Sequence, residues 1–217
     1  MMISPEAYYE LYLKDKNEKQ IMTQIRSLKR EINHLKSTME HPEYQCMMLP
    51  SEDVRIECNR SYLDRAKQAL TDIGSTYISS KAELKSEEFN ENIPYISKVE
   101  FGIGGVFSGY ETRTYIIDGD NIHINIERSP ITSPADSEKD EAEEMDKEFF
   151  LSELADLHIG EWRKKYDPSR WGYAILDGTL WHLYIYYSNG HRTVKFDGSN
   201  DYPYNFNRLT ELLGLDV

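Results

Sequence analysis

Cysteine, basic charge and long apolar runs are all scarce in this sequence, and each shortage excludes a class of protein. The only cysteines are Cys46 and Cys58, and no further Cys or His is spaced to complete a zinc site. We therefore expect free thiols, as in a cytoplasmic protein. No apolar run approaches the roughly 18 residues of a membrane span, and the N-terminus lacks the apolar core of a signal peptide. We expect no membrane association and no cofactor.

Positive charge is also scarce, and the shortage is uneven along the chain. The formal net charge is −13 over 217 residues. Residues 1–80 hold 11 Lys and Arg against 12 Asp and Glu, whereas residues 81–217 hold 14 against 26. Because such an excess of acids repels phosphate, we expect no direct nucleic-acid binding unless local patches oppose the mean. A basic protein, or one that itself binds nucleic acid, is the partner that this surface attracts.

Residues 1–80 carry the pattern of an antiparallel helical hairpin. Ser4 with Pro5 and then Asn17 provide helix starts, and Gly74 is suited to a helix C-terminus. Between them, two runs repeat at alternating steps of three and four residues, as in a coiled-coil seam. These positions are Ile21, Ile25, Leu28, Ile32, Leu35 and Met39, then Ile56, Asn59, Leu63, Ala66, Leu70 and Ile73. Because Met22 widens the apolar stripe, we also hypothesise a homodimer through these helices.

The rest of the chain predicts an α+β domain at residues 96–217, joined to the hairpin by a polar linker at 81–95. Residues Val99, Phe101 and Ile103 alternate with polar neighbours, and similar alternation recurs around Ile124 and Leu183. A helix after the third strand carries Phe149 and Leu154. The element order is β-β-β-α-β-β-α, which indicates an antiparallel sheet with helices packed on one face.

A set of aromatic and glycine positions in the C-terminal half carries a family resemblance. The pattern comprises Trp171, Asp177-Gly178, Trp181-x-Leu183-x-Ile185-x-Tyr187, Gly190, Gly198 and Tyr202-Pro203-x-Asn205-Phe206. It resembles a domain of unknown function in uncharacterised proteins of Gram-positive (Firmicutes) gut bacteria, over roughly residues 96–214. The resemblance implies a fold and a bacterial source, and it implies no catalytic residue.

Two glycine-containing motifs have both a structural and a functional interpretation. The segment 102–109, GIGGVFSG, contains glycines that could cradle phosphate, but it lacks a Gly-Lys-Ser/Thr sequence and a strand follows it. A bulged or bent strand is favoured. Asp118 and Asp120 could begin a cation loop, but isoleucines occupy the following ligand positions, so a hairpin turn is favoured.

Asp156, His158 and Glu161 form the compact cluster of titratable side chains in the sequence. An Asp and a His two residues apart could share a metal or relay a proton, which would suit a small hydrolase or a metal-dependent enzyme. With no second His or Cys nearby, a polar helix end is favoured. No catalytic residue is assigned, and the enzyme interpretation is kept as the alternative.

The strand around residues 180–187 is aromatic on both of its faces. Trp181, Leu183 and Ile185 form the face that belongs in the core, whereas Tyr184 and Tyr186 lie on the other face, together with His182. That second face is too aromatic for an ordinary solvated surface, so it either binds a partner or is covered. We favour covering by the N-terminal hairpin, with partner binding as the alternative.

The motif that follows this strand is expected to be structural. Pro203 fixes the backbone where the last helix begins, Asn205 can cap that helix, and Phe206 is expected to pack against the sheet.

The segment from Asp136 to Glu148 holds eight acids against two lysines. It is expected to form a solvated loop and a helix start, and Glu141, Glu143, Glu144 and Asp146 are its candidate partner-binding residues. The composition favours a non-catalytic cytoplasmic protein-binding or adaptor protein. The leading specific hypothesis is an inhibitor or modulator with an acidic surface, encoded on a mobile element. Its target would be a host or defence complex that binds nucleic acid.

Overall fold

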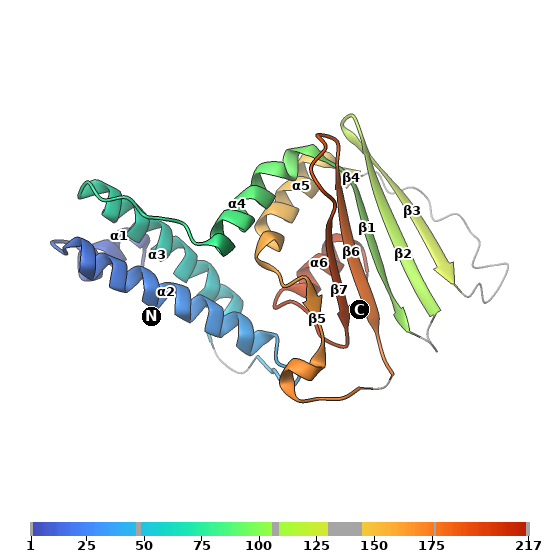
Figure 1. The fold of residues 1–217 in the computed structure, drawn as a ribbon, viewed down its shortest axis with the longest axis horizontal. Coiled ribbons are helices and arrows are strands. Elements are labelled where there is room, and N and C mark those ends of the chain that lie inside the picture. The colour runs from blue at the N-terminus through green and yellow to red at the C-terminus, as the bar shows by residue number, and fades with distance from the viewer. Residues whose placement is uncertain (1, 47–48, 106–108, 130–144, 176, 216–217) are drawn as a thin grey trace. The chain divides into compact units, whose positions relative to one another are not determined.

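The structure, a computed structural model, describes residues 2–46, 49–105, 109–129, 145–175 and 177–215. The chain divides into two compact units, Met1–Ser79 and Ser80–Val217, each with its own hydrophobic core (Figure 1). Among the described residues, no helix has the length and apolar character needed to cross a membrane.

The first unit is the helical hairpin that the sequence predicts. It begins with α1 (Pro5–Tyr8) and a π-helical turn (Tyr9–Leu13), followed by α2 (Glu18–Met39) and α3 (Glu52–Asp72). Ser4 caps α1 by accepting the backbone N–H of Ala7, and Asn17 forms a capping box with Gln20 at the start of α2. The start of α2 meets the end of α3, because Ser75 donates to Glu18 at 3.0 Å. The two long helices are therefore antiparallel.

The buried stripe of α3 differs from the predicted seam. Tyr62 is buried where the seam predicts Leu63, and Ile73 is 49% exposed because α3 ends at Asp72. The Tyr62 ring stacks on Tyr8, with centroids 4.4 Å apart, and its hydroxyl donates to the backbone oxygen of Ile3 at 2.8 Å. The helix α3 thus packs on the N-terminal segment as well as on α2, which widens its buried side beyond a strict seam.

The second unit is an α+β domain built on a seven-stranded sheet, which confirms the predicted fold class. Six strand pairs are ordered β4-β3-β2-β1-β6-β7-β5, and all are antiparallel except β5 with β7. The strands are β1 (Ile96–Gly105), β2 (Gly109–Asp118), β3 (Asn121–Ser129), β4 (Met145–Asp146), β5 (Lys165–Tyr166), β6 (Leu180–Tyr187) and β7 (Val194–Ser199).

Three α-helices cover one face of this sheet, α4 (Lys81–Asn92), α5 (Lys147–Asp156) and α6 (Phe206–Leu212) (Figure 1). Short 3-10 turns connect the elements at Ile93–Tyr95, Ile159–Glu161 and Pro168–Trp171. The core lies between the helices and the sheet, where Val99, Phe101, Leu183, Ile185 and Phe196 are fully buried. The strand alternation that the sequence shows therefore selects the face that the helices cover.

The predicted linker at 81–95 is wrong, because these residues form α4 and the 3-10 turn after it. Ser80 caps α4 in a capping box with Glu83, and Phe89 and Ile93 are buried in the sheet domain's core. The helix also fits closely against Gly160, where an added Cβ would lie 2.9 Å from the Ser86 Cα. The polar sequence of α4 reflects a helix that buries a narrow stripe and exposes the rest.

Both glycine motifs lie in strands or turns of the sheet. Residues 102–105 form part of β1 and pair with β2 in continuous register, so the predicted bulge is not present there, and residues 106–108 fall outside the described residues. Asp118 and Asn121 are paired across a two-residue turn, in which Gly119 has a φ of 61°. That left-handed conformation favours glycine and matches a tight β-hairpin turn.

The last helix begins as predicted, but Asn205 does not cap it. Asn205 makes no capping hydrogen bond. Its side chain instead accepts the Trp162 indole N–H at 3.0 Å and donates to the Leu157 backbone oxygen at 2.7 Å. Asn205 therefore ties three separate segments together inside the core. Phe206 is 4% exposed and contacts Trp181, with centroids 5.0 Å apart, as the sequence predicts for a structural residue.

Candidate partner-binding face

The face of the sheet opposite the three helices gathers aromatic, charged and small side chains. Its residues follow from the strand registers, since paired residues point to the same side of an antiparallel sheet. Within the described part of residues 80–217, α4, α5 and α6 all pack on the other side (Figure 1). We call this surface the open face, and it comprises Lys98, Glu100, Gly102, Thr112, Thr114, Ile116, His123, Asn125, Glu127, His182, Tyr184, Tyr186, Lys195 and Asp197.

The central row of the open face crosses four strands. Thr114 of β2, Glu100 of β1, Tyr184 of β6 and Lys195 of β7 are consecutive partners in the register. The Lys195 ammonium lies 4.8 Å from the centroid of the Tyr184 ring. At such a distance the cation is attracted to the ring's π-electrons, which favours contact between the two side chains.

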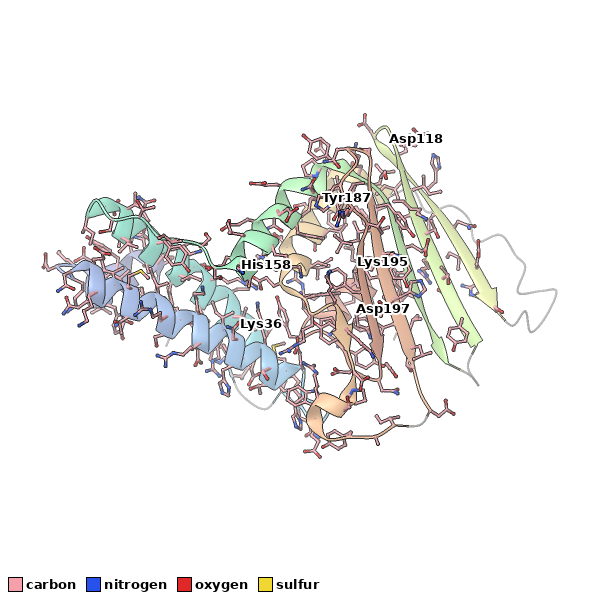
Figure 2. The ribbon with its side chains drawn as sticks, viewed as in Figure 1. Lys36, Asp118, His158, Tyr187, Lys195 and Asp197 are labelled. Carbon is pink, nitrogen blue, oxygen red and sulfur yellow. The ribbon has the colours of Figure 1, made fainter. Side chains whose placement is uncertain are left out.

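Tyr184 is also fixed through its hydroxyl. The hydroxyl donates to a carboxylate oxygen of Asp197 at 3.1 Å, and Lys195 and Asp197 both come from β7 (Figure 2). Burial and the neighbouring Asp197 carboxylate raise the pKa of Tyr184 above its usual value. The phenol therefore stays protonated at neutral pH and acts as a donor, so it is a recognition group rather than a base.

A second aromatic–cation pair lies beside the first. The Lys98 ammonium sits 3.9 Å from the centroid of the Tyr186 ring and 3.0 Å from a carboxylate oxygen of Glu100. The hydrogen bond to Glu100 raises the pKa of Lys98, and burial opposes that rise. The charge of Lys98 is thereby held in place between a ring and a carboxylate.

A glycine makes room for the imidazole on this face. His182 is paired with Gly102, and a Cβ at Gly102 would lie 2.2 Å from the His182 Cε1 atom. The ring therefore lies across the backbone of β1, with its Nε2 atom 3.8 Å from Glu100 and its centroid 4.7 Å from the Tyr184 ring. Gly102 thus sets the position of His182, and through it the shape of the middle of the open face.

The structure brings only part of the predicted site together. Tyr184 and Tyr186 lie side by side on the open face, as their alternation predicts. Asp146 lies elsewhere, in the short strand β4, where its carboxylate accepts the backbone N–H of Phe149 at 2.8 Å and caps α5. The other three acidic candidates, Glu141, Glu143 and Glu144, lie outside the described residues. Covering of the open face by the N-terminal hairpin stays a prediction.

The enzyme alternative receives no support from the placement of its residues. Asp156 ends α5 and is exposed, His158 has a left-handed backbone with a φ of 48°, and Glu161 is exposed on the next turn. Within the described ranges, no group of three His, Cys, Asp or Glu side chains could hold a metal ion. The three residues thus form the helix end that the sequence analysis favours.

Sequence reasoning missed the residues that surround the two tyrosines. Lys98 and Glu100 lie at least 84 residues before the two tyrosines, and Lys195 and Asp197 come from the strand after them. Each looks like an ordinary solvated charge in the sequence. Alternation in β1 and β7 could have placed them on the solvent side. Only the registers of β6 with β1 and with β7 show that they lie against the tyrosine rings.

No family model, curated protein or solved structure matches this chain. The resemblance to the domain of unknown function accordingly stays a prediction.

Proposed function

We propose that this chain is a non-catalytic protein-binding or adaptor protein that receives a protein partner on the open face. The observation that carries the proposal is the ordered pair of tyrosine rings, Tyr184 and Tyr186. Each contacts a lysine, and the described helices of residues 80–217 pack on the other face of the sheet. Tyrosines are enriched among the residues that contribute most to protein interfaces, since they bury a large ring and lose little side-chain entropy.

The charges on and around the open face favour a protein partner over a nucleic acid. Lys98 and Lys195 are balanced on this face by Glu100 and Asp197. The surrounding residues 81–217 carry 26 acids against 14 basic residues. Single-stranded nucleic acids also stack on aromatic sheet faces, but they need a groove of net positive charge for their phosphates.

The specific form of the proposal is an inhibitor or modulator of a basic, nucleic-acid-binding complex, encoded on a mobile element. Its support is the excess of acids in the second part of the chain, which would compete with phosphate for a basic surface. The proposal places the protein in the cytoplasm, where its partner would also be found.

The test is affinity capture from the source cell, comparing the natural chain with the Tyr184→Ala/Tyr186→Ala double variant. Loss of both rings is expected to reduce capture of a specific partner at least tenfold, since buried interface tyrosines often contribute 2 kcal/mol or more. Tyr95→Ala is the matched control, because Tyr95 is 50% exposed and belongs to the 3-10 turn before β1. Equal capture by all three proteins would refute binding through this face.

A further inference from the structure

The solvent side of α2, the long helix drawn in blue in Figure 1, carries a line of positive charge. Lys19, Arg26 and Arg30 are seven and four residues apart, so they project from one side of the helix, opposite the buried stripe. The side chains around them are short or polar. We call this surface the basic ridge, and it comprises the exposed residues Lys19, Thr23, Arg26, Ser27, Arg30, Asn33 and His34.

The acidic residues of α2 lie beside the basic ridge and are engaged with the end of α3 or its flank. Residues 18–39 hold five Lys and Arg against two Glu, a net charge of 5 − 2 = +3. Glu31 accepts a hydrogen bond from Arg55 at 2.8 Å, and Glu18 accepts one from Ser75 at 3.0 Å. Among the described residues, none of the three cations of the ridge forms an ion pair. Their charge is therefore available to a partner.

This local charge opposes the mean charge of the chain. The chain carries −13 in total, but residues 1–80 are close to neutral, with 11 basic residues against 12 acids. Salt screens charges that lie farther away than a Debye length of about 8 Å at physiological ionic strength. A nearby anion therefore meets mainly the cations of the ridge. Such a patch is the exception that leaves nucleic-acid binding open despite the acidic composition.

The chemistry of the basic ridge excludes several kinds of occupant. Protein interfaces depend on buried aromatic or apolar anchors, and the ridge has none. A membrane surface takes up the apolar side of an amphipathic helix, whereas the apolar side of α2 is buried in the core of the first unit. A second copy would bring like charges face to face. The remaining occupant is a polyanion.

We propose that the basic ridge binds the phosphate backbone of a nucleic-acid duplex. Arginine, lysine, serine, threonine and asparagine are the side chains that contact phosphates and position a protein on a duplex. The 22 residues of α2 extend over about 33 Å, and an exposed helix fits the major groove of DNA. Single strands need aromatic rings for base stacking, and α2 contains no Phe, Tyr or Trp.

This binding does not depend on the proposed function. The basic ridge belongs to the first unit, whereas the open face belongs to the second. With both surfaces, the chain would contact a nucleic acid through its helical hairpin and a protein through its sheet. The experiments below use only the purified chain and nucleic acid, so their outcome is separate from that of the affinity capture.

The first test follows the fluorescence anisotropy of a labelled, random-sequence DNA duplex of about 20 base pairs as the full chain is added. We expect a dissociation constant on the order of 1–100 μM at about 50 mM salt, as for non-specific binders. Each phosphate contact adds about −0.9 to the slope of log K against log salt concentration. Three cations therefore predict a slope of about −3 between about 50 and 200 mM salt.

The second test removes charge from the basic ridge. Arg26→Gln/Arg30→Gln is expected to weaken binding at least tenfold at low salt and to reduce the slope to about −1. Both positions are exposed and glutamine suits a helix, so circular dichroism should be unchanged. Lys164→Gln/Lys165→Gln is the matched control, since it removes the same net charge from exposed residues of the second unit. It should change neither the affinity nor the slope.

A third variant adds charge to the basic ridge instead of removing it. Thr23 lies on the ridge between Lys19 and Arg26 and is exposed. Thr23→Arg is expected to tighten binding to the duplex and to steepen the slope by about 1, because it adds one phosphate contact. This gain does not depend on the folding of the double glutamine variant.

Three results would overturn the proposal. The first is no change in anisotropy with about 100 μM chain at low salt, where non-specific binders are saturated or nearly so. The second is binding that Arg26→Gln/Arg30→Gln and the lysine control reduce equally, which would mean that only net charge matters. The third is tighter binding to the single strand, or to a glutamate-rich peptide, than to the duplex.

Discussion

At the scale of single residues, two buried tyrosine hydroxyls of the sheet domain differ in their hydrogen bonding. The Tyr115 hydroxyl is buried and donates to the Leu213 backbone oxygen at 2.6 Å. The Tyr187 hydroxyl is also buried, but among the described residues it has no hydrogen-bond partner (Figure 2). Burial and the nearby Glu88 raise the pKa of Tyr187, so its hydroxyl stays protonated. A buried hydroxyl without a partner costs free energy.

We expect the same Tyr→Phe change to have opposite effects at these two positions. Tyr187→Phe should leave the free energy of unfolding unchanged or raise it by up to about 1 kcal/mol, whereas Tyr115→Phe should lower it by about 1 kcal/mol. Denaturant unfolding followed by tryptophan fluorescence measures both, since all three tryptophans lie in residues 80–217. A clear loss of stability in Tyr187→Phe would show that its hydroxyl has a partner.

Glu111 is a residue whose ionisation should contribute to stability. Burial alone would raise its pKa, but hydrogen bonds from Arg113 at 2.6 Å and Arg128 at 2.9 Å outweigh burial and lower the pKa. A carboxylate with a lowered folded-state pKa stabilises the fold above its unfolded-state pKa of about 4.3. That contribution is lost as the pH falls through the lower, folded-state value.

The corresponding prediction concerns Glu111→Gln. The natural chain should be more stable than the variant above about pH 5, and the difference should shrink steadily as the pH falls below about 4.3. Denaturant unfolding across that pH range measures the difference. Glu148→Gln, at an exposed glutamate on α5, is the control and should differ little from the natural chain at any pH. A difference that grows towards acid pH would contradict the expected sign.

At the scale of elements, α4 shows how a polar segment becomes part of a core. Its residues include Glu87, Glu88 and Glu91, which are exposed, while Phe89 on the same helix is 4% exposed. A single buried aromatic in three turns is enough to anchor α4 in the core of the sheet domain, because α4 lies against Gly160, which allows a close approach. The sequence of α4 has too few apolar residues to show a helical stripe, so its pattern alone predicts a polar linker.

A pair of alanine substitutions on α4 tests this placement. Phe89→Ala should lower the free energy of unfolding of the sheet domain by about 3–5 kcal/mol, as for other buried aromatics. Leu84→Ala, on the same helix but 54% exposed, should change it by less than about 0.5 kcal/mol. Tryptophan fluorescence again reports the domain that contains α4. Equal small effects would mean that residues 81–92 connect the two units without packing on either.

At the scale of the whole molecule, charge is distributed unevenly between two separately packed units. The first unit is close to neutral, and the excess of acids belongs to the rest of the chain. The acidic segment from Asp136 to Glu148 contributes −6 of that excess. Charge of this kind speeds association with a basic partner, and salt screens it over a Debye length of about 8 Å at physiological ionic strength.

The prediction at this scale is a salt-dependent association rate. Replacing Glu141, Glu143 and Glu144 with Gln, together with Asp146→Asn, should slow association with a captured basic partner at low salt and change it little at high salt. Asparagine also caps helices, so the last change should spare the start of α5. Stopped-flow or surface-based kinetics at both salt concentrations provide the measurement. Equal association rates for the variant and the natural chain at both salt concentrations would show that the segment has no role in electrostatic steering.

The sequence by itself determined the features that depend on neighbouring residues. Caps at Ser4 and Asn17, the turn after Asp118 and the alternation in β1 and β6 all follow from local rules, and the structure confirms each. The same local rules give the α+β class and the side of each strand that is buried. They also placed Tyr184 and Tyr186 together, because residues two apart in a strand share a face.

Where local rules allowed several side chains to be buried or to form a hydrogen bond, the tertiary structure decided between them. Phe150 is buried instead of the expected Phe149, because Phe150 and Leu154 are four residues apart and share a helix face. Asn205 bonds to Leu157 and Trp162, which flank the 3-10 turn after α5, although its position also suits a cap. The surroundings of the tyrosine pair depend on the register between β1 and β6, in which Glu100 pairs with Tyr184, 84 positions away. Such long-range pairing is an outcome of packing the whole domain, and no window of the sequence contains it.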